Sequence, residues 1–447
     1  MIDNMIARYY QLLKEFVQIQ SISTNDEYIP EIKKTSKWLK KIFEENKMDV
    51  KIIDWYWNPI IIAEYIHDDK LPTVTIYWNY DIVSAYKKDW RKEDPFSLYI
   101  WKENIYWRGV ADNKWQILIH MLAIFELIKE KNIWYNIRFL IEWEKITWSK
   151  DTKRFIIENK ENLKSDFILL SDWNLVNQHW WIWVSTRWDI ELQLTIKTSD
   201  NNINLWYFWW IVPNAIHELS KLTSKLYWAN TQINIPYFYY QVQTPVFDTI
   251  LRNKKIEFNK EEIQKHLWIK EIFKEKTFDY ISQIWLRPTI QITSIHSGSQ
   301  NQLENITIQN IATANINFKT VIRQNSDNII KSFQQRTLAN LPKYVEHYIY
   351  INRKSEPVQI NKDNKYFSKA EWFLQEIFHN EPIQLNLGVN IPILDTIISN
   401  ITDNIIIIPL SNYDSNTNCS NENIEIKLVE KWFLFTLNFL SKQLQLF

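Results

Sequence analysis

The first part of the chain alternates between two spacings of apolar residues. Helical spacing predicts amphipathic helices at 3–20, 30–46, 116–130 and 151–162. Short runs rich in Ile, Val and aromatic residues predict strands at 49–55, 60–66, 73–78, 136–143 and 167–172. Strands that alternate with helices indicate an α/β fold, with a mostly parallel mixed sheet flanked by helices. Ligands of such sheets bind beyond the carboxyl ends of the strands.

The pattern changes near residue 188. Apolar alternation predicts strands at 189–198, 289–298 and 312–321, and helical spacing predicts a helix at 214–226. The alternation of helices and strands seen in the first part of the chain then returns, with helices at 326–341 and 367–379, a strand at 404–410 and a final helix from about 423. We therefore predict a discontinuous first domain made of 1–187 and 319–447, with 188–318 inserted as a separate α+β domain.

The composition is unusual in two residue types. The chain has 3 Gly and 24 Trp in 447 residues, whereas ordinary usage predicts roughly 31 glycines. The two counts together approach that expectation, and many tryptophans stand in turn-like contexts such as "DWYWNP" and "IYWRGVADNKWQ". We hypothesise that UGA codons read as glycine by the source organism are represented here as tryptophan. The alternative is a genuinely Trp-rich protein, and Trp38 and Trp90 do occupy ordinary helix and loop contexts.

The charge balance excludes several partners. Lys+Arg and Asp+Glu both number 52, so nothing in the charge attracts nucleic acid or an anionic membrane. No apolar run approaches the roughly 18–20 residues that span a bilayer. The single Cys419 excludes an intrachain disulfide, which fits a reducing compartment. We expect a soluble cytoplasmic protein.

With Trp read as Gly, five segments stand out in order. They are "IYGNYDIVSA" (76–85), "IYGRGVADNKGQ" (105–116), "IEGEKITGSKD" (141–151), "SDGN" (171–174) and "NCSNEN" (418–423). In order and spacing they resemble the co-catalytic dizinc hydrolase family, which includes carnosine-type dipeptidases, glutamate carboxypeptidase, aminoacylases and succinyl-diaminopimelate desuccinylase. The resemblance covers nearly the whole chain and lies in the dipeptidase-like branch.

The resemblance implies a zinc-peptidase-like catalytic domain, with 188–318 as a lid and dimerisation domain. It also implies two Zn²⁺ ions held by His, Asp and Glu side chains, and a carboxylate general base that activates the bridging water. Asp81 matches the residue that orients a metal-binding His, Asp112 the bridging ligand, and Asp172 a further ligand. Glu144 matches the general base if one inserted residue is allowed.

Other positions depart from the family pattern. Asn79 and Asn418 stand where the family has metal-binding His, and Lys145 and Ile146 stand at the Glu-Glu pair when no gap is allowed. Asn204 replaces a lid His that helps to hold substrate. A carboxamide is a poor zinc ligand and an ammonium repels zinc, so these changes predict a broken dizinc site.

Two functions follow from these departures. The first is a non-catalytic homologue that binds a peptide-like or N-acyl amino acid ligand, as a homodimer through the lid or beside an active paralogue. The second is an active dipeptidase or deacylase with an altered metal site. Individual residues also have simpler interpretations: Asp112 alone would be a loop carboxylate that caps a helix, and His120 a hydrogen-bonded helix residue.

Overall fold

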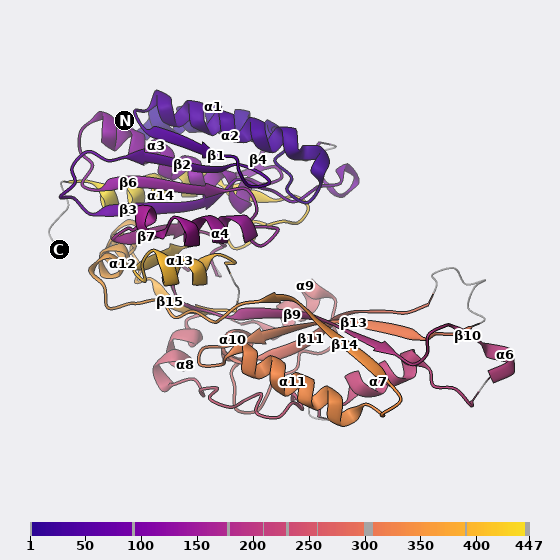
Figure 1. Ribbon diagram of the computed structural model, residues 1–447. Coiled ribbons are helices and arrows are strands. Elements are labelled where there is room, and N and C mark those ends of the chain that lie inside the picture. The colour runs from indigo at the N-terminus through magenta and orange to yellow at the C-terminus, as the bar shows by residue number, and fades with distance from the viewer. Residues whose placement is uncertain are drawn as a thin grey trace.

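The fold comes from a computed structural model of the chain (Figure 1). It describes residues 2–91, 94–176, 179–208, 210–228, 232–256, 258–298, 307–388 and 391–442.

A six-stranded mixed sheet forms the centre of the first domain. Its strand order is β1-β2-β6-β3-β7-β16. β6, β3, β7 and β16 are mutually parallel, while β1 and β2 add antiparallel pairs at one edge. The strands are β1 Asp49–Ile53, β2 Ile60–Tyr65, β3 Thr73–Asn79, β6 Asn136–Glu142, β7 Phe167–Ser171 and β16 Ile405–Ile408. This arrangement confirms the predicted mostly parallel sheet.

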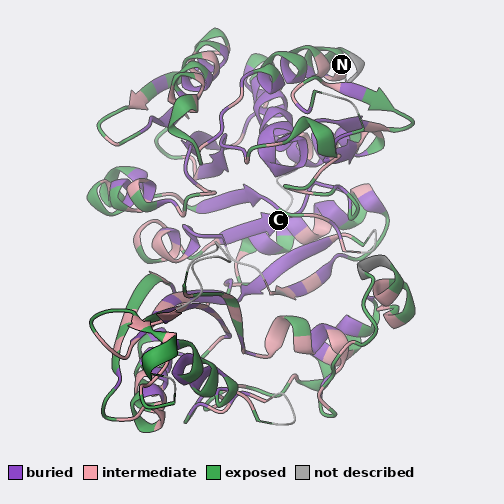
Figure 2. Ribbon diagram, turned by 90° about the vertical axis from the view of Figure 1, so that its right-hand side faces the viewer, coloured by how far each residue is buried: buried purple, intermediate pink, exposed green. Residues whose placement is uncertain are grey.

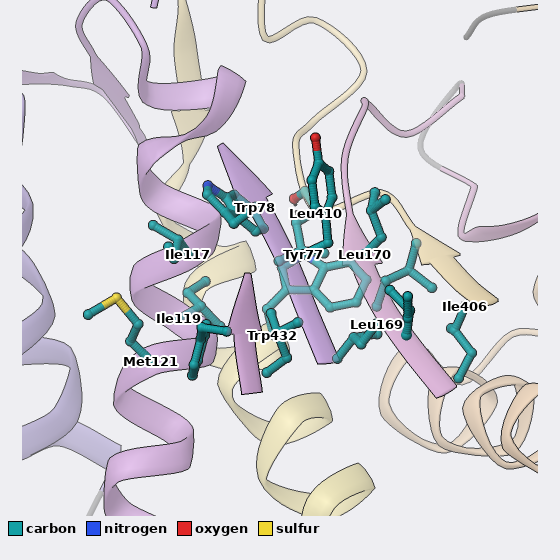
Figure 3. Close-up of a cluster of buried hydrophobic side chains, with 14 of the residues drawn as sticks. Tyr77, Trp78, Ile117, Ile119, Met121, Leu169, Leu170, Ile406, Leu410 and Trp432 are labelled. Carbon is teal, nitrogen blue, oxygen red and sulfur yellow. Dashed lines mark hydrogen bonds between the residues drawn. The ribbon is translucent and has the colours of Figure 1, made fainter. Parts of the chain in front are cut away.

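Helices flank this sheet (Figure 1). They are α1 Ile2–Gln18, α2 Ile29–Glu45, α3 Trp115–Lys129, α4 Lys150–Glu158, α5 Lys160–Leu163, α12 Lys365–Phe378, α13 Leu394–Asn400 and α14 Ile426–Leu440. The central strands are buried along nearly their whole length (Figure 2), because both faces of a parallel sheet are covered. Figure 3 shows one part of that core, where Trp78, Ile119 and Trp432 meet.

The second domain contains a four-stranded antiparallel sheet in the order β11-β13-β9-β14. Its strands are β9 Trp188–Lys197, β11 Thr289–His296, β13 Ile311–Thr320 and β14 Glu346–Lys354, and its helices are α6 Leu205–Phe208, α7 Ala215–Ser224, α8 Phe247–Lys254, α9 Lys260–Leu267, α10 Tyr280–Leu286 and α11 Ser326–Asn340. α7 and α11 cover one face, where Leu219 and Phe333 pack with Leu192. β9 therefore alternates buried and half-buried residues.

The point at which the chain returns from the second domain to the first differs from the expected one. We expected the chain to rejoin the first domain at residue 319, yet β14 is hydrogen-bonded to β9 over most of its length. α11 also buries Ile329, Ile330 and Phe333 in the core of the second domain. The chain leaves this sheet only after residue 354, because the helix and strand that follow β13 complete it.

Three small sheets connect or extend these domains. β8 Trp181–Thr186 and β15 Ile383–Leu387 pair in parallel beside β16, while β4 Tyr99–Trp101, β5 Asn104–Tyr106 and β17 Asn423–Glu425 form a second sheet, and β10 Ile203–Asn204 with β12 Thr307–Ile308 a third. The short helical turns are η1 Asp26–Tyr28, η2 Lys87–Asp89 and η3 Val110–Lys114. Among the described residues, no helix is long and apolar enough to cross a membrane.

Several tryptophans occupy backbone positions that suit glycine. Trp148, Trp173, Trp210 and Trp268 have φ values of 81°, 80°, 70° and 56°. The left-handed region costs a residue with a Cβ roughly 1–2 kcal/mol, and glycine avoids this cost. Five indole N–H groups are buried without a hydrogen-bond partner among the described residues, those of Trp78, Trp107, Trp143, Trp183 and Trp188. Both observations support the glycine hypothesis.

We expect Trp268→Gly to stabilise the protein. Trp268 ends α9 in the left-handed conformation and is 94% exposed, so its replacement loses little packing. Relief of the strain predicts a gain of about 1 kcal/mol, or about 2 °C in Tm. The control is Trp55→Gly, which is 90% exposed but has no positive φ and is expected to lower Tm slightly. A thermal scan in which both variants lose stability equally contradicts this expectation.

Candidate functional site

The sequence-predicted residues come mainly from the carboxyl ends of parallel strands. Asn79 is the last residue of β3, and Asp81 follows it; Asp172 directly follows β7. Asp112 lies in the segment before α3, and Asn418 lies in the loop between β16 and β17. Because β3, β7 and β16 end at one edge of the sheet, these loops lie at the place where α/β folds bind ligands.

Lys145 joins three of these elements in one cluster, which we call the Lys145 cluster. Its Nζ lies 2.9 Å from Asp112 Oδ1 and 2.8 Å from Asp172 Oδ2. The amide of Asn418 donates to Asp112 Oδ2 at 2.8 Å. The three charged side chains are between 7% and 13% exposed, so the ion pairs are largely shielded from water.

Asp172 and Lys145 each stabilise the charged form of the other. Burial raises the pKa of Asp172, and the Lys145 ammonium acts against that rise. Burial lowers the pKa of Lys145, but the two carboxylates outweigh burial and hold it well above its usual value. The ammonium is therefore firmly protonated, and the cluster carries one cation for two carboxylates.

Asn79 and Asp81 form a neighbouring hydrogen-bonded group. Asn79 Nδ2 donates to Asp81 Oδ1 at 3.0 Å. Asp81 Oδ2 accepts from Ser23 Oγ at 3.0 Å and from the backbone N–H of Ile146 at 2.9 Å. Burial raises the pKa of Asp81 to about 6, although these hydrogen bonds oppose the rise. Asp81 thus fixes the backbone beside Lys145, and Asn79 turns toward Asp81.

Glu422 is a central residue to which the sequence reasoning assigned no role. Its carboxylate is fully buried and accepts from Arg108 Nη1 at 2.6 Å. It also accepts from the backbone N–H groups of Gly109, Ala111 and Asp112 at 3.1, 2.8 and 3.0 Å. Glu422 therefore holds the segment that presents Asp112. The only sequence signal was its place in the "NCSNEN" segment.

Gly109 shows why this segment needs a residue without a side chain. Its φ is 83°, and a Cβ would lie 2.4 Å from Ile82 Cγ2. Such a contact is too short to be tolerated, so the turn before Asp112 requires glycine on steric grounds as well as for its backbone conformation.

The structure does not bring Glu144 into the Lys145 cluster. Glu144 Oε1 accepts the backbone N–H of Thr152, in the first turn of α4, at 2.6 Å. Burial raises the pKa of Glu144 to about 7. Nearby Glu142 accepts from Ser149 Oγ at 2.7 Å and from the hydroxyl of Tyr77, and burial raises its pKa to about 8. These carboxyl groups support the loop that carries Lys145.

Asn204 also lies apart from the cluster. It belongs to β10, is exposed, and its side-chain oxygen accepts the backbone N–H of Trp206 at 2.9 Å. Figure 1 shows β10 at the end of the second domain that is remote from β15. Within one chain, Asn204 is therefore not part of the same cleft.

His120 has the structural role that was expected of it. It is fully buried, with Nδ1 3.0 Å from Thr436 Oγ1 and Nε2 2.7 Å from Ser171 Oγ. Burial lowers its pKa to about 3, so the ring is neutral and satisfied. It is not available as a ligand.

The residues of the Lys145 cluster do not fit a pair of zinc ions. Two carboxylates would face a charge of four, and the cluster's neutral amide is a weak ligand. Lys145 Nζ already occupies hydrogen-bonding distance of both carboxylates. A zinc ion held by Asp112 and Asp172 would have to displace this ammonium. No catalytic step through zinc follows from this donor set.

Comparisons with known proteins agree with the fold and the motifs. A family described as "Peptidase dimerisation domain" matches residues 210–345. Human Beta-Ala-His dipeptidase is 23% identical over 379 residues, covering 82% of this chain and 74% of that protein. The Cys-Gly metallodipeptidase DUG1 of Candida albicans is 20% identical over 486 aligned positions, covering 95% of this chain and 92% of that protein.

Solved structures show the same fold. Human carnosine dipeptidase 1 superposes with a TM-score of 0.83 at 21% identity, covering 98% of this chain and 96% of the other. An M20 family metallo-carboxypeptidase from Sulfolobus solfataricus gives 0.86 at 21% identity, covering 97% and 98%. Together with the sequence relatives, these structures confirm the resemblance expected from the motifs. The chain is therefore similar to M20 peptidases, dipeptidases among them, in sequence over most of its length and in fold.

Proposed function

We propose that this protein is a non-catalytic member of the dipeptidase-like group that binds a peptide-like or N-acyl amino acid ligand. The observation that carries the proposal is the position of Lys145 Nζ, 2.9 Å from Asp112 and 2.8 Å from Asp172. A protonated amine between these carboxylates supplies the positive charge that a metal would otherwise supply, without the Lewis acidity.

The surrounding residues support the same proposal. Asn79 and Asn418 donate hydrogen bonds to carboxylates, a role that needs no metal. Glu144, the alternative general base, is hydrogen-bonded to the start of α4. A missing general base alone reduces the rate of such a hydrolysis by roughly 10²–10⁴-fold. An active hydrolase with an altered metal site is the alternative that the metal experiment below distinguishes.

A homodimer through the second domain is part of the proposal. The match to a peptidase dimerisation domain supports it, as do the exposed side chains of Tyr207 and Ile211. The apolar stripe of α7 does not support a dimer interface, because Leu219 and Leu222 are buried in the core of their own domain. We further propose that the protein acts in the cytoplasm, because its one cysteine, Cys419, is free and exposed. Pairing with an active paralogue is the other assembly that this surface would allow.

Lys145→Met is expected to destabilise the protein by about 3 kcal/mol, because it leaves two largely buried carboxylates without their cation. The matched control is Lys150→Met, at the exposed first residue of α4, which is expected to change stability by less than about 0.5 kcal/mol. Urea unfolding of both variants measures the difference. Equal midpoints would show that the ammonium does not compensate the carboxylates.

The metal content tests the proposed function directly. The protein with glycine at the recoded positions, purified in the presence of zinc, is expected to retain less than one tightly bound zinc and to lack chelator-sensitive dipeptidase activity. The combined Asn79→His, Lys145→Glu, Ile146→Glu, Asn418→His variant is expected to regain zinc, because it restores imidazole and carboxylate ligands together. Asn79→His alone serves as the control and should regain little. Two zinc ions and chelator-sensitive hydrolysis in the unmodified protein would overturn the proposal.

The dimer is tested by sedimentation. At micromolar concentration the protein is expected to sediment as a dimer, and Tyr207→Glu to shift it toward monomer, because the charge would have to be buried in the interface. The control is Trp55→Glu, on an exposed loop of the first domain. A monomeric unmodified protein would exclude the homodimer.

A further inference from the structure

A second polar site lies where the chain passes between the two domains. It is a cavity of about 260 Å³. On one side it is bounded by the ends of β8 and β15, and on the other by α8, α10 and the segment after β13; Figure 1 shows α8 and α10 close below β15. Its lining shares no residue with the Lys145 cluster.

The charge of this cavity has one sign. Arg187, Arg252, Arg323 and Lys362 line it, and no Asp or Glu does so among the described residues. Arg187 directly follows β8, and Arg252 belongs to α8. Arg323 lies between β13 and α11, and Lys362 lies between β14 and α12. Cations that line one cavity repel one another. A bound anion would reduce that repulsion.

Arg187 is the buried member of this set. It is 6% exposed, and its Nη1 donates to the carbonyl oxygen of Ile284. Its Nε and Nη2 have no hydrogen-bond partner among the described residues. A buried guanidinium without its full set of acceptors is costly. Burial lowers the pKa of Arg187 to about 10, which reflects the same cost.

Two carboxylates interact electrostatically with these cations, but neither lines the cavity. Asp189 acts on Arg187 electrostatically, but it is paired with Lys319 and does not line the cavity. Glu371 acts on Lys362 in the same way, yet it accepts a hydrogen bond from Gln384 and also lies outside the lining. The cavity keeps an excess of positive charge.

Two of the remaining cations are oriented by neutral groups. Arg252 donates to Gln384 Oε1 and Thr249 Oγ1, both at 3.2 Å. The amide oxygen of Gln243, in the orientation that satisfies both groups, accepts from Arg323 Nη1 at 2.6 Å. Neutral partners position a guanidinium without neutralising it, which leaves its charge for a ligand.

We propose that this cavity, which we call the Arg187 cavity, binds a small organic oxyanion, a carboxylate or a phosphate ester. Guanidinium groups bind the planar or tetrahedral oxygens of such anions through paired hydrogen bonds. The volume exceeds the roughly 30 Å³ share of one water by several fold, so it admits more than a single inorganic ion. Val246, Leu286 and Val321 provide apolar contacts for an organic part. The ligand would contact both domains at once.

Thermal unfolding with two probes tests this proposal. Inorganic phosphate and glutarate are titrated separately into the full-length protein at constant ionic strength, with chloride as the reference anion. Saturable stabilisation by at least one probe is expected, because a ligand that binds only the folded state raises Tm. Stabilisation by phosphate alone identifies a phosphate ligand, and stabilisation by glutarate alone identifies a carboxylate.

Matched variants locate the binding. Arg252→Gln and Lys362→Gln are each expected to weaken the active probe about tenfold, the effect of one lost charge-assisted hydrogen bond. Lys343→Gln, on the exposed surface of the second domain, should leave the affinity unchanged. If neither probe stabilises beyond chloride, or if Lys343→Gln weakens binding as much as Lys362→Gln, the proposal fails. Hydrolysis is not measured, so this outcome is independent of the zinc experiment.

Discussion

The ion pairs of Lys145 with Asp112 and Asp172 hold together the loops at the carboxyl ends of the central strands. The carboxylates come from different segments of the sheet domain, since Asp112 precedes α3 and Asp172 follows β7, and both are largely buried. Two such groups without a cation would oppose folding, since an unpaired buried charge costs several kcal/mol. One ammonium from the loop after β6 satisfies both, and it thereby joins three segments that are distant in the sequence.

The backbone around these residues is held by other carboxylates. Glu422 accepts hydrogen bonds from three backbone N–H groups ahead of α3, those of Gly109, Ala111 and Asp112. Asp81 accepts a hydrogen bond from the backbone N–H of Ile146, beside Lys145. Neither contact depends on a bound ion. These loops therefore keep their shape through hydrogen bonds within the protein, in a fold that superposes on that of human carnosine dipeptidase 1.

The sequence predicted the sheet well because its strands are continuous apolar runs bounded by polar turns, as in "TVTIYWN" and "NIIIIPL". It failed at α11 and β14, since helical period shows which face is apolar but not which sheet that face covers. It placed Asp112, Asp172 and Asn418 together through the motifs. It could not settle whether Glu144 or Lys145 stands at the general-base position, because one inserted residue moves the Glu-Glu pair from Lys145 and Ile146 to Glu144 and Lys145. Only the direction of the side chains distinguishes the two alignments. The Arg187 cavity was missed because its cations lie on segments far apart in the chain.

The choice of lysine at position 145 is itself informative. A neutral residue there would leave Asp112 and Asp172 as two buried like charges, which raises the free energy of the folded state. Lysine compensates both carboxylates, so they can be retained without a metal. The same ammonium excludes zinc from those oxygens, because the two cations would occupy the same space and repel each other. While this ion pair is formed, zinc can reach the oxygens of Asp112 and Asp172 only if the Lys145 ammonium first moves away from them.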